Sequence, residues 1–265
     1  MTVVSRPLST QLPAAVPART VLSIRGVRKT YGPVGNRVLA LEGISLDVRR
    51  GEFLCLVGAS GCGKSTLLNL ITELDRPSGG EIVIDGRPSL LFQEAALFPW
   101  LTAAGNVQLP MKLAKVPRHR RDQQVERLLD LVHLSDFGDK LPHELSGGMR
   151  QRVAVARALA QDADILLMDE PFGSLDAMTR DLLHDELERI WRETGVTVLF
   201  VTHDVREAVR LGDRIVVLTS RPGRVADEFV VDLPRPRNIA SAEVGALAAS
   251  VTERLRAEVR RHAND

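Results

Sequence analysis

The chain has 265 residues, of which 44% are hydrophobic and 26% charged, enough for one large domain or one domain with a modest subdomain. Its 35 basic and 34 acidic side chains leave a net charge of +1, which excludes a broad field that attracts nucleic acid or acidic lipid. No apolar run reaches the roughly 20 residues that a membrane-spanning helix needs. Any membrane role therefore depends on a partner's helices.

The first 20 residues contain several prolines, no acidic side chain and no compact apolar core of a secretory signal. We expect residues 1–20 to form a disordered tail. The cysteines, Cys55 and Cys62, are close in sequence, and we expect no structural disulfide between them. Their small number suits the reducing cytosol.

Strand and helix signals follow in alternation. Four early segments have the length and composition of strands: LSIRGVRKTY (with a turn at its end), GISLDV, EFLCLVG and EIVID. The third is continuously apolar, which predicts burial on both faces. Lys64 to Leu74 predicts a helix that ends near Pro77. The link between Asp85 and Gln93 is short, so the sequence does not decide how the sheet edge there is formed.

From about Phe92 to Ala160 the pattern becomes helical. One apolar stripe at helical spacing contains Val125, Leu128, Leu129 and Val132. Ser146 has the residue type and place to cap a helix through VAVARALA.

Three strands then return, in DILLMD, TVLFVT and DRIVVLT. Helices at Met178 to Glu193 and Val205 to Leu211 separate them, and this alternation predicts a mostly parallel sheet. Residues 236–265 predict a closing amphipathic helix, on an apolar stripe made of Val244, Leu247, Val251, Leu255 and Val259. The expected plan is an α/β core with a helical subdomain, about residues 94–160, inserted in its middle.

The segment GASGCGKST, residues 58–66, follows a predicted strand and fits the phosphate-loop pattern G-x-x-x-x-G-K-[ST]. Glycines at fixed places let backbone amides turn around a phosphate chain, and the next helix adds its positive end. Lys64 has the reach to contact the β- and γ-phosphates, and Ser65 offers a hydroxyl to Mg²⁺. The residues expected to line this site are Gly58, Ala59, Ser60, Gly61, Cys62, Gly63, Lys64, Ser65 and Thr66. The competing interpretation is a glycine-rich structural turn.

Cys62 has two interpretations, a small space-filling residue or a thiol made reactive by Lys64 and the helix end.

Three further segments supply candidate catalytic groups. Asp169 ends an apolar strand where it can hold Mg²⁺, and Glu170 follows as candidate general base for an attacking water. His203 follows another apolar strand, at the sheet edge where ligands bind, to contact the γ-phosphate and orient Glu170. Gln93, where sheet gives way to helix, is a candidate sensor of Mg²⁺ and water. The alternatives are two acids capping a strand, a structural histidine and a surface glutamine.

The segment HELSGGMRQRVAVARAL, residues 143–159, resembles the signature motif of ABC ATPases, with LSGGM at 145–149. DEPFGSLD is similar to the family's Walker B end and D-loop, and VTHD to its His switch. Tyr31 in KTYG matches the aromatic that stacks on adenine. The resemblance extends from about Val21 to Arg224. Met149 stands where the family usually has Gln, and Ser174 where Ala is common.

The resemblance implies an ATPase with a phosphate-loop NTPase core of mostly parallel sheet, an antiparallel β subdomain and the inserted α-helical signature subdomain, together residues 21–235. It implies a head-to-tail dimer in which Ser146, Gly147 and Gly148 present amides to ATP held by the second subunit. Mg²⁺ would be held by Ser65, Gln93 and Asp169.

Among ABC proteins, the short interval between Gln93 and the signature disfavours a repair or chromosome ATPase with a long coiled coil, and one phosphate loop disfavours a translation-factor type. The lack of membrane helices disfavours an exporter with its own. FQEAALFPWLTAAGNV, DEPFGSLDAMTR and SRPGRV resemble importers of nitrate, aliphatic sulfonates, taurine or bicarbonate. The alternative is a soluble ABC-type ATPase not coupled to transport.

An importer ATPase implies location at the cytoplasmic face of the cell membrane. Its partners would be a second ATPase subunit, permease subunits and a periplasmic or lipid-anchored solute-binding protein, and we expect no nucleic acid. The stretch Leu97, Phe98, Pro99 and Trp100 either joins a groove for a permease helix or packs the subdomain's own core. The basic run from Arg118 to Arg121 predicts a solvated helix start.

Overall fold

A six-stranded sheet with the order β5-β6-β7-β3-β8-β9 forms the centre of the computed structural model, and a three-stranded antiparallel sheet, β2-β1-β4, lies beside it. The structure describes residues 19–33 and 35–263, so the predicted tail lies almost wholly outside the described residues. The large sheet is parallel except at β9, which pairs antiparallel with β8. The strands are β1 (Thr20–Tyr31), β2 (Val38–Arg49), β3 (Phe53–Val57), β4 (Gly79–Ile84), β5 (Pro88–Leu91), β6 (Ile165–Asp169), β7 (Thr197–Thr202), β8 (Arg214–Leu218) and β9 (Val225–Val230).

The three central strands of the large sheet are buried on both faces, as their apolar runs predict. In β3, Phe53 and Cys55 pack into one hydrophobic core while Leu54 and Leu56 pack into a second. Strands β6 and β7 alternate in the same way. The sheet therefore separates two cores, and these three strands have no polar face.

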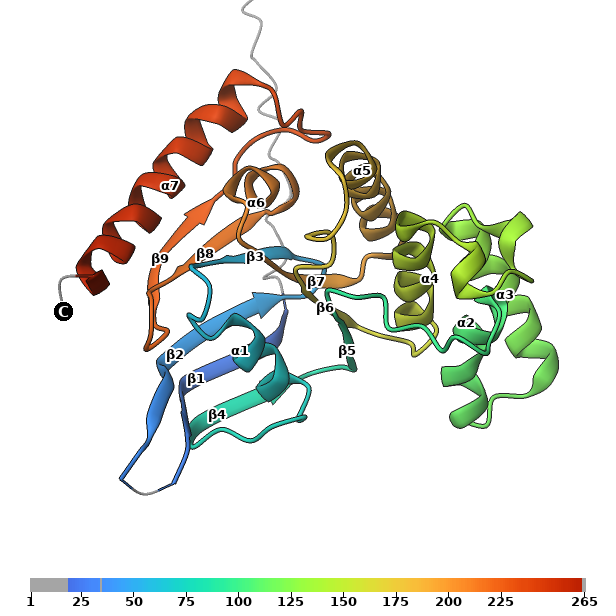
Figure 1. Ribbon diagram of the computed structural model, residues 1–265, viewed down its shortest axis with the longest axis horizontal. Helices are drawn as coiled ribbons and strands as arrows, with labels where there is room; N and C mark the ends of the chain where they lie inside the picture. The colour runs from blue at the N-terminus through green and yellow to red at the C-terminus, as the bar shows by residue number, and fades with distance from the viewer. Residues whose placement is uncertain (1–18, 34, 264–265) are drawn as a thin grey trace, which may run out of the picture.

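Helices cover the two faces differently (Figure 1). The core on the side of α5 and α6 extends into α2, α3, α4 and α7, whereas the other is closed by α1, β1 and β2. The α-helices are α1 (Lys64–Ile71), α2 (Ala103–Leu113), α3 (Arg118–Leu131), α4 (Gly147–Leu159), α5 (Ala177–Thr194), α6 (Val205–Leu211) and α7 (Ala242–Ala263). Two short 3₁₀ helices are η1 (Ser135–Phe137) and η2 (Pro142–Glu144).

The inserted helices gather at one end of the molecule, on the right of Figure 1. Thr102 caps α2 by accepting from the amide of Gly105. The side chain of Asn106 is fully buried and bonds the backbone of Phe98 and Leu101, which fixes the segment before α2. The predicted stripe of α3 is buried, and Ser146 caps α4 as predicted.

Several element boundaries differ from the sequence prediction. β1 stays extended through Tyr31 rather than turning, because β2 pairs with it up to that residue. α1 ends at Ile71 instead of Leu74, and α7 begins at Ala242 rather than at residue 236. The sheet edge at residues 85–93, which the sequence leaves undecided, is formed by β5, which pairs parallel to β6.

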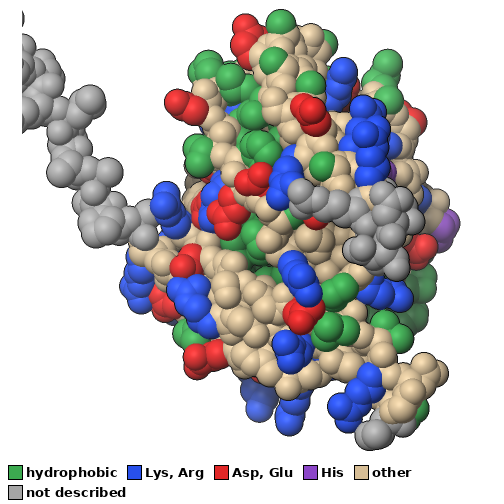
Figure 2. Space-filling model, turned by 90° about the vertical axis from the view of Figure 1, so that its left-hand side faces the viewer, with side chains coloured by type: hydrophobic (Ala, Val, Ile, Leu, Met, Phe, Trp, Pro, Cys, Tyr) green, Lys and Arg blue, Asp and Glu red, His purple; other side chains and the backbone are tan. Residues whose placement is uncertain are grey.

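Charged side chains of both signs are interspersed on the face shown in Figure 2, in line with the net charge of +1. Within residues 19–33 and 35–263, no helix combines the length and apolar character needed to cross a membrane.

Candidate active site

The phosphate-loop motif connects β3 to α1. Gly63 is the N-cap of α1 with a left-handed backbone (φ 97°), and no side chain caps this helix. A Cβ on Gly63 would lie 2.5 Å from Leu41 Cδ2 and 3.2 Å from the Ala40 carbonyl oxygen, so the position needs glycine. The first-turn amides of α1 therefore have the uncapped arrangement in which helix N-termini bind anions.

Lys64, the first residue of α1, is buried, with 6% of its surface exposed. Its ammonium donates to the carbonyl oxygens of Gly58 (2.8 Å) and Ala59 (3.2 Å). The same nitrogen lies 3.8 Å from Glu170 Oε1. One cation thus joins the phosphate loop to the segment that follows β6, while Ser60 and Ser65 of the loop are exposed.

Cys62 fills space beneath the loop. Its side chain is 1% exposed, and burial raises the pKa of its thiol although the nearby Lys64 ammonium acts to lower it. A Cβ on Gly58 would lie 2.6 Å from the Cys62 sulfur, so the thiol occupies the room that this glycine leaves. The structure supports the space-filling interpretation over the reactive one. Cys55 is also buried, and both thiols are free, as expected.

The two candidate catalytic side chains meet at hydrogen-bond distance. Glu170 follows Asp169, the last residue of β6, with φ 46°, and its amide donates to the Val201 carbonyl (3.0 Å). His203 directly follows β7, and its Nδ1 lies 2.8 Å from Glu170 Oε2. Since Lys64 faces the other carboxylate oxygen, three separate segments converge on one side chain.

Gln93 follows β5 and is held through its backbone. The side chain of Gln151, on α4, donates from Nε2 to the Gln93 carbonyl oxygen (2.8 Å). A Cβ on Gly173 would lie 3.5 Å from Gln93 Nε2, so the glutamine side chain reaches the turn that follows Glu170. Gln93 therefore lies between the signature helix and the candidate base.

The candidate Mg²⁺ donors are a hydroxyl from Ser65, an amide from Gln93 and a carboxylate from Asp169, all of them kinds of oxygen that Mg²⁺ accepts. In the part of the chain that the structure describes, no group of three or more His, Cys, Asp or Glu side chains forms a metal cluster. These oxygen types fit the usual Mg²⁺ site, where one or two carboxylates act together with substrate phosphates.

Tyr31 ends β1 and is partly exposed. Its phenol donates to Asp75 Oδ2 (2.9 Å), and the ammonium of Lys29 lies over its ring, 4.7 Å from the centroid. Lys29 also donates to Asp75 Oδ1 (2.5 Å), and this hydrogen bond lowers the pKa of the Asp75 carboxyl. The ring is therefore held in place from one face and at its hydroxyl end.

The signature residues begin α4. The hydroxyl of Ser146 accepts from the Met149 amide (3.2 Å), and Gly147 and Gly148 form the first turn. A Cβ on Gly148 would lie 2.8 Å from Thr179 Cγ2, so this glycine lets α4 approach α5 closely. Because α4 packs against α2, α3, α5 and β5, away from α1, its start and the phosphate loop lie in separate parts of one chain (Figure 1).

Comparison with known proteins identifies the family to which this arrangement belongs. A family model described as ABC transporter matches residues 41–173. An uncharacterised ABC transporter ATP-binding protein of Methanocaldococcus jannaschii is 46% identical over 230 residues, which are 84% of this chain and 86% of that protein. The chain belongs to the ABC transporter family. The resemblance stated from the motifs is thereby confirmed.

Other ABC relatives have named substrates. The taurine import ATP-binding protein of Roseobacter denitrificans is 43% identical over 219 residues, covering 79% of this chain and 82% of that protein. The nitrate import ATP-binding protein of Synechococcus elongatus is 48% identical over 216 residues, covering 77% of this chain but 33% of its own length.

A solved dimeric ATP-binding cassette in a post-hydrolysis state, bound to ADP and Pi, superposes with a TM-score of 0.70 and 34% identity, over 80% of this chain and all of that one. The predicted fold class is confirmed. As an ABC cassette, the chain binds nucleotide and is an ATPase.

The two departures from the ABC motifs are mild. Met149 packs against the core on the α5 and α6 side of the large sheet, and Ser174 is exposed. Sequence reasoning missed the side chains that support the site, Gln151 behind Gln93 and Arg180, which donates to the carbonyls of Phe172 and Leu175. No local pattern identifies them, since their partners are backbone atoms of other segments.

Proposed function

We propose that this chain is the ATP-hydrolysing subunit of an importer for a small anion such as nitrate, an aliphatic sulfonate, taurine or bicarbonate. The observation that carries the hydrolytic assignment is the carboxylate of Glu170, placed between Lys64 of the phosphate loop and His203. The names of the taurine and nitrate relatives support the importer assignment.

In this proposal ATP lies along the phosphate loop. The amides from Gly58 to Thr66 and the uncapped start of α1 bind its phosphates. The Lys64 ammonium neutralises the β- and γ-phosphate oxygens. Adenine stacks on the Tyr31 ring, whose orientation is held by Lys29 and Asp75. Ser65, Gln93 and Asp169 hold Mg²⁺, which when bound supplies positive charge beside the phosphates.

Hydrolysis follows from the contact between the two catalytic candidates. Glu170 accepts a proton from the water whose oxygen attacks the γ-phosphorus, and the bond from that phosphorus to the ADP oxygen breaks. The 2.8 Å contact with His203 orients the carboxylate and leaves the imidazole exposed toward the γ-phosphate. Gln93, beside the turn after Glu170, positions the same water.

Two copies are needed for a complete site. Ser146, Gly147 and Gly148 begin α4, away from the phosphate loop of their own chain, and so act on ATP held by a second subunit. Dimeric solved relatives support this arrangement. Binding of two ATP molecules closes the dimer, and hydrolysis loosens it.

The test is ATP hydrolysis by the purified chain with Mg²⁺, measured over a range of protein concentrations. A composite site predicts activity that rises faster than linearly with concentration and is lost in Glu170→Gln, which also dimerises with ATP. Glu193→Gln, an exposed α5 carboxylate paired with Arg189, is the matched control and keeps activity. Activity that is linear in concentration and indifferent to Glu170 would contradict the site assignment.

Coupling to a permease is proposed at a groove of about 740 Å³ between the inserted helices and β5. Its walls include Phe92, Phe98 and Leu113, all exposed, together with the basic Arg120 and Arg157. We assign as its occupant a short amphipathic helix of the membrane subunit that carries an acidic residue. The subunit then lies at the cytoplasmic membrane face, and a solute-binding protein delivers the anion to the permease.

The two interpretations of the stretch from Leu97 to Trp100 apply to different residues within it. Leu97 packs against the core on the α5 and α6 side of the large sheet, and Phe98 lines the groove. Trp100, 72% exposed, contacts the Phe98 ring in a tilted arrangement with centroids 5.5 Å apart. Phe98→Ala and Trp100→Ala should hydrolyse ATP alone but respond less to the membrane subunits. Val83→Ala, an exposed apolar residue of β4 outside the groove, is the control, and normal coupling in both groove variants would exclude this site.

A further inference from the structure

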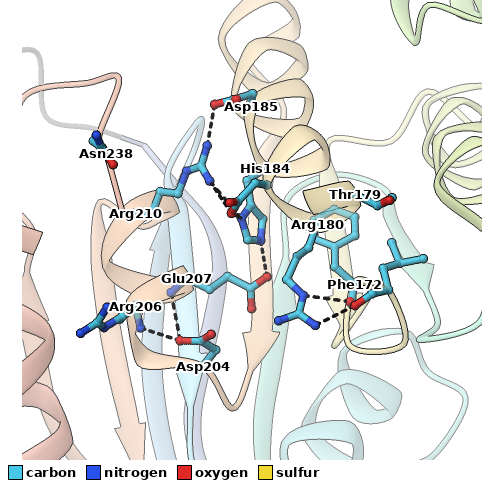
Figure 3. Close-up of polar contacts among 12 residues, drawn as sticks. Phe172, Thr179, Arg180, His184, Asp185, Asp204, Arg206, Glu207, Arg210 and Asn238 are labelled. Carbon is cyan, nitrogen blue, oxygen red and sulfur yellow. Dashed lines mark hydrogen bonds and ion pairs between the residues drawn. The ribbon is translucent and has the colours of Figure 1, made fainter. Parts of the chain in front are cut away.

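A buried histidine outside the ATP site is the centre of a polar network in Figure 3. His184 lies on α5 with 1% exposure, and its Nε2 is 2.5 Å from Glu207 Oε1 on α6. Glu207 is buried as well. Two titratable side chains thus face each other inside the core, in a contact that the hydrolytic scheme does not use.

The network reaches the segment that carries His203. The second carboxylate oxygen of Glu207 accepts from the hydroxyl of Thr202, the last residue of β7. That hydroxyl also accepts from the Asp204 amide (3.0 Å), and Asp204 caps α6. The residues on both sides of His203 are therefore fixed through Glu207, and Glu207 through His184.

The same histidine touches the segment that carries Glu170. Its ring meets Phe172 edge-on, with centroids 5.5 Å apart and an interplanar angle of 64°. Phe172 lies two residues after Glu170, and Arg180 binds its carbonyl oxygen (Figure 3). His184 thus contacts Phe172, two residues after Glu170, and Glu207, which accepts from the residue before His203.

Neighbouring polar groups define the hydrogen bonds of the His184 ring. The guanidinium of Arg210 lies 3.3 Å from Nδ1 and carries only donors, so Nδ1 accepts and Nε2–H donates to Glu207. From its own helix, Asp181 approaches Nδ1 to 3.8 Å, and Asp185 binds Arg210 at 2.5 Å. The ring is thus held between a carboxylate at Nε2 and a guanidinium at Nδ1.

We propose that His184 is a positioning residue for ATP hydrolysis, which keeps His203 and Glu170 at hydrogen-bond distance by bracing Glu207 on one side and Phe172 on the other. This inference rests on the proposed roles of Glu170 and His203. His184 itself does not touch the nucleotide.

The test compares His184→Gln with His184→Ala in steady-state ATP hydrolysis. A glutamine amide can donate to Glu207 and accept from Arg210, the two partners of the imidazole, so kcat should stay within about threefold of wild type. The alanine variant should lose roughly ten- to hundredfold in kcat, the scale of a misplaced catalytic group, with KM for ATP within about twofold. Thr202→Val, which removes the hydroxyl from the same network, should lower kcat with the same constant KM.

The variant Leu187→Ala distinguishes a positioning role from a merely structural one. It creates a cavity elsewhere on α5 and should lower the unfolding temperature while preserving kcat in the folded protein. Wild-type kcat in both His184→Ala and Thr202→Val would overturn the inference, as would equal kcat losses in the alanine and glutamine variants. If Glu170→Gln also kept its activity, the proposed hydrolytic site would be wrong. An inactive Glu170→Gln beside a fully active His184→Ala would overturn only the positioning role.

Discussion

The phenol of Tyr31 donates a 2.9 Å hydrogen bond to Asp75, which ties the end of β1 to the segment that follows α1. Since α1 begins at the phosphate loop, the ring expected to stack on adenine and the loop expected to bind the phosphates are connected through one carboxylate. The two ends of the proposed nucleotide site are thus connected by a direct hydrogen bond.

This contact should be visible in the titration of Tyr31, the single tyrosine of the chain. Burial, followed by the hydrogen bond to Asp75, raises the pKa of the Tyr31 phenol. In Asp75→Ala the acceptor is lost while the Lys29 ammonium remains over the ring, so the pKa should fall. Tyrosinate absorbance against pH measures this pKa, and circular dichroism confirms folding. Asp136→Ala, which removes a carboxylate elsewhere in the chain, is the control. Equal midpoints in wild type and Asp75→Ala would contradict the contact.

Removal of the Tyr31 ring should weaken ATP binding only by loss of its contact with adenine. Loss of one base–aromatic stack costs about 1–3 kcal/mol, so Tyr31→Ala should raise the Kd for ATP by roughly 5- to 160-fold. Inorganic tripolyphosphate, which has no base, should bind wild type and variant equally in calorimetry. Tyr31→Phe keeps a stacking surface and should lie near wild type for ATP. A loss of tripolyphosphate binding in Tyr31→Ala would show that the effect comes from the loop instead.

Both cysteines should resist modification in the folded protein. Burial raises the pKa of the Cys62 thiol and raises that of Cys55 well above its usual range, so little thiolate is present near neutral pH. A thiol-reactive chromophore should label almost nothing in the native chain and both cysteines after unfolding. One fast-reacting thiol in the native state, protected by ATP, would restore the reactive interpretation of Cys62.

Two glycines should respond oppositely to alanine. A Cβ on Gly223 would lie 2.2 Å from the Cys62 carbonyl oxygen, so Gly223→Ala must displace the phosphate loop. It should lose about 1–3 kcal/mol of unfolding free energy and bind ATP more weakly. A Cβ on Gly245 in α7 would meet no atom of another segment within 4 Å, and alanine should add roughly 0.5–1 kcal/mol of unfolding free energy without affecting ATP binding. Denaturant unfolding and nucleotide titration of both variants check this contrast.

The parts of the fold that rest on local pattern were predictable. The runs around Leu54, Leu167 and Leu199 are apolar on both faces because each central strand lies between two cores. The order of the motifs along these strands indicated which side chains gather at one sheet edge, and Glu170 and His203 do meet there. Ser146 capped its helix because the cap depends on neighbours in sequence.

The supporting contacts were not predictable, because they join segments far apart in the chain. His184 and Glu207 each occupy an ordinary place on an amphipathic helix, and only the packing of α5 against β7 and α6 brings them together. The boundary of β1 was wrong for a similar reason, since pairing with β2 rather than local propensity keeps Tyr31 extended. Strand β5 is too short to indicate itself and depends on its pairing with β6.

Glu170 has a backbone conformation, φ 46°, that a residue with a side chain adopts at a cost of about 1–2 kcal/mol. Glycine would relieve that strain but would also remove the carboxylate that contacts Lys64 and His203. The strained backbone is thus retained at the position where the proposed base must stand, and a Glu170→Gly chain should hydrolyse no ATP.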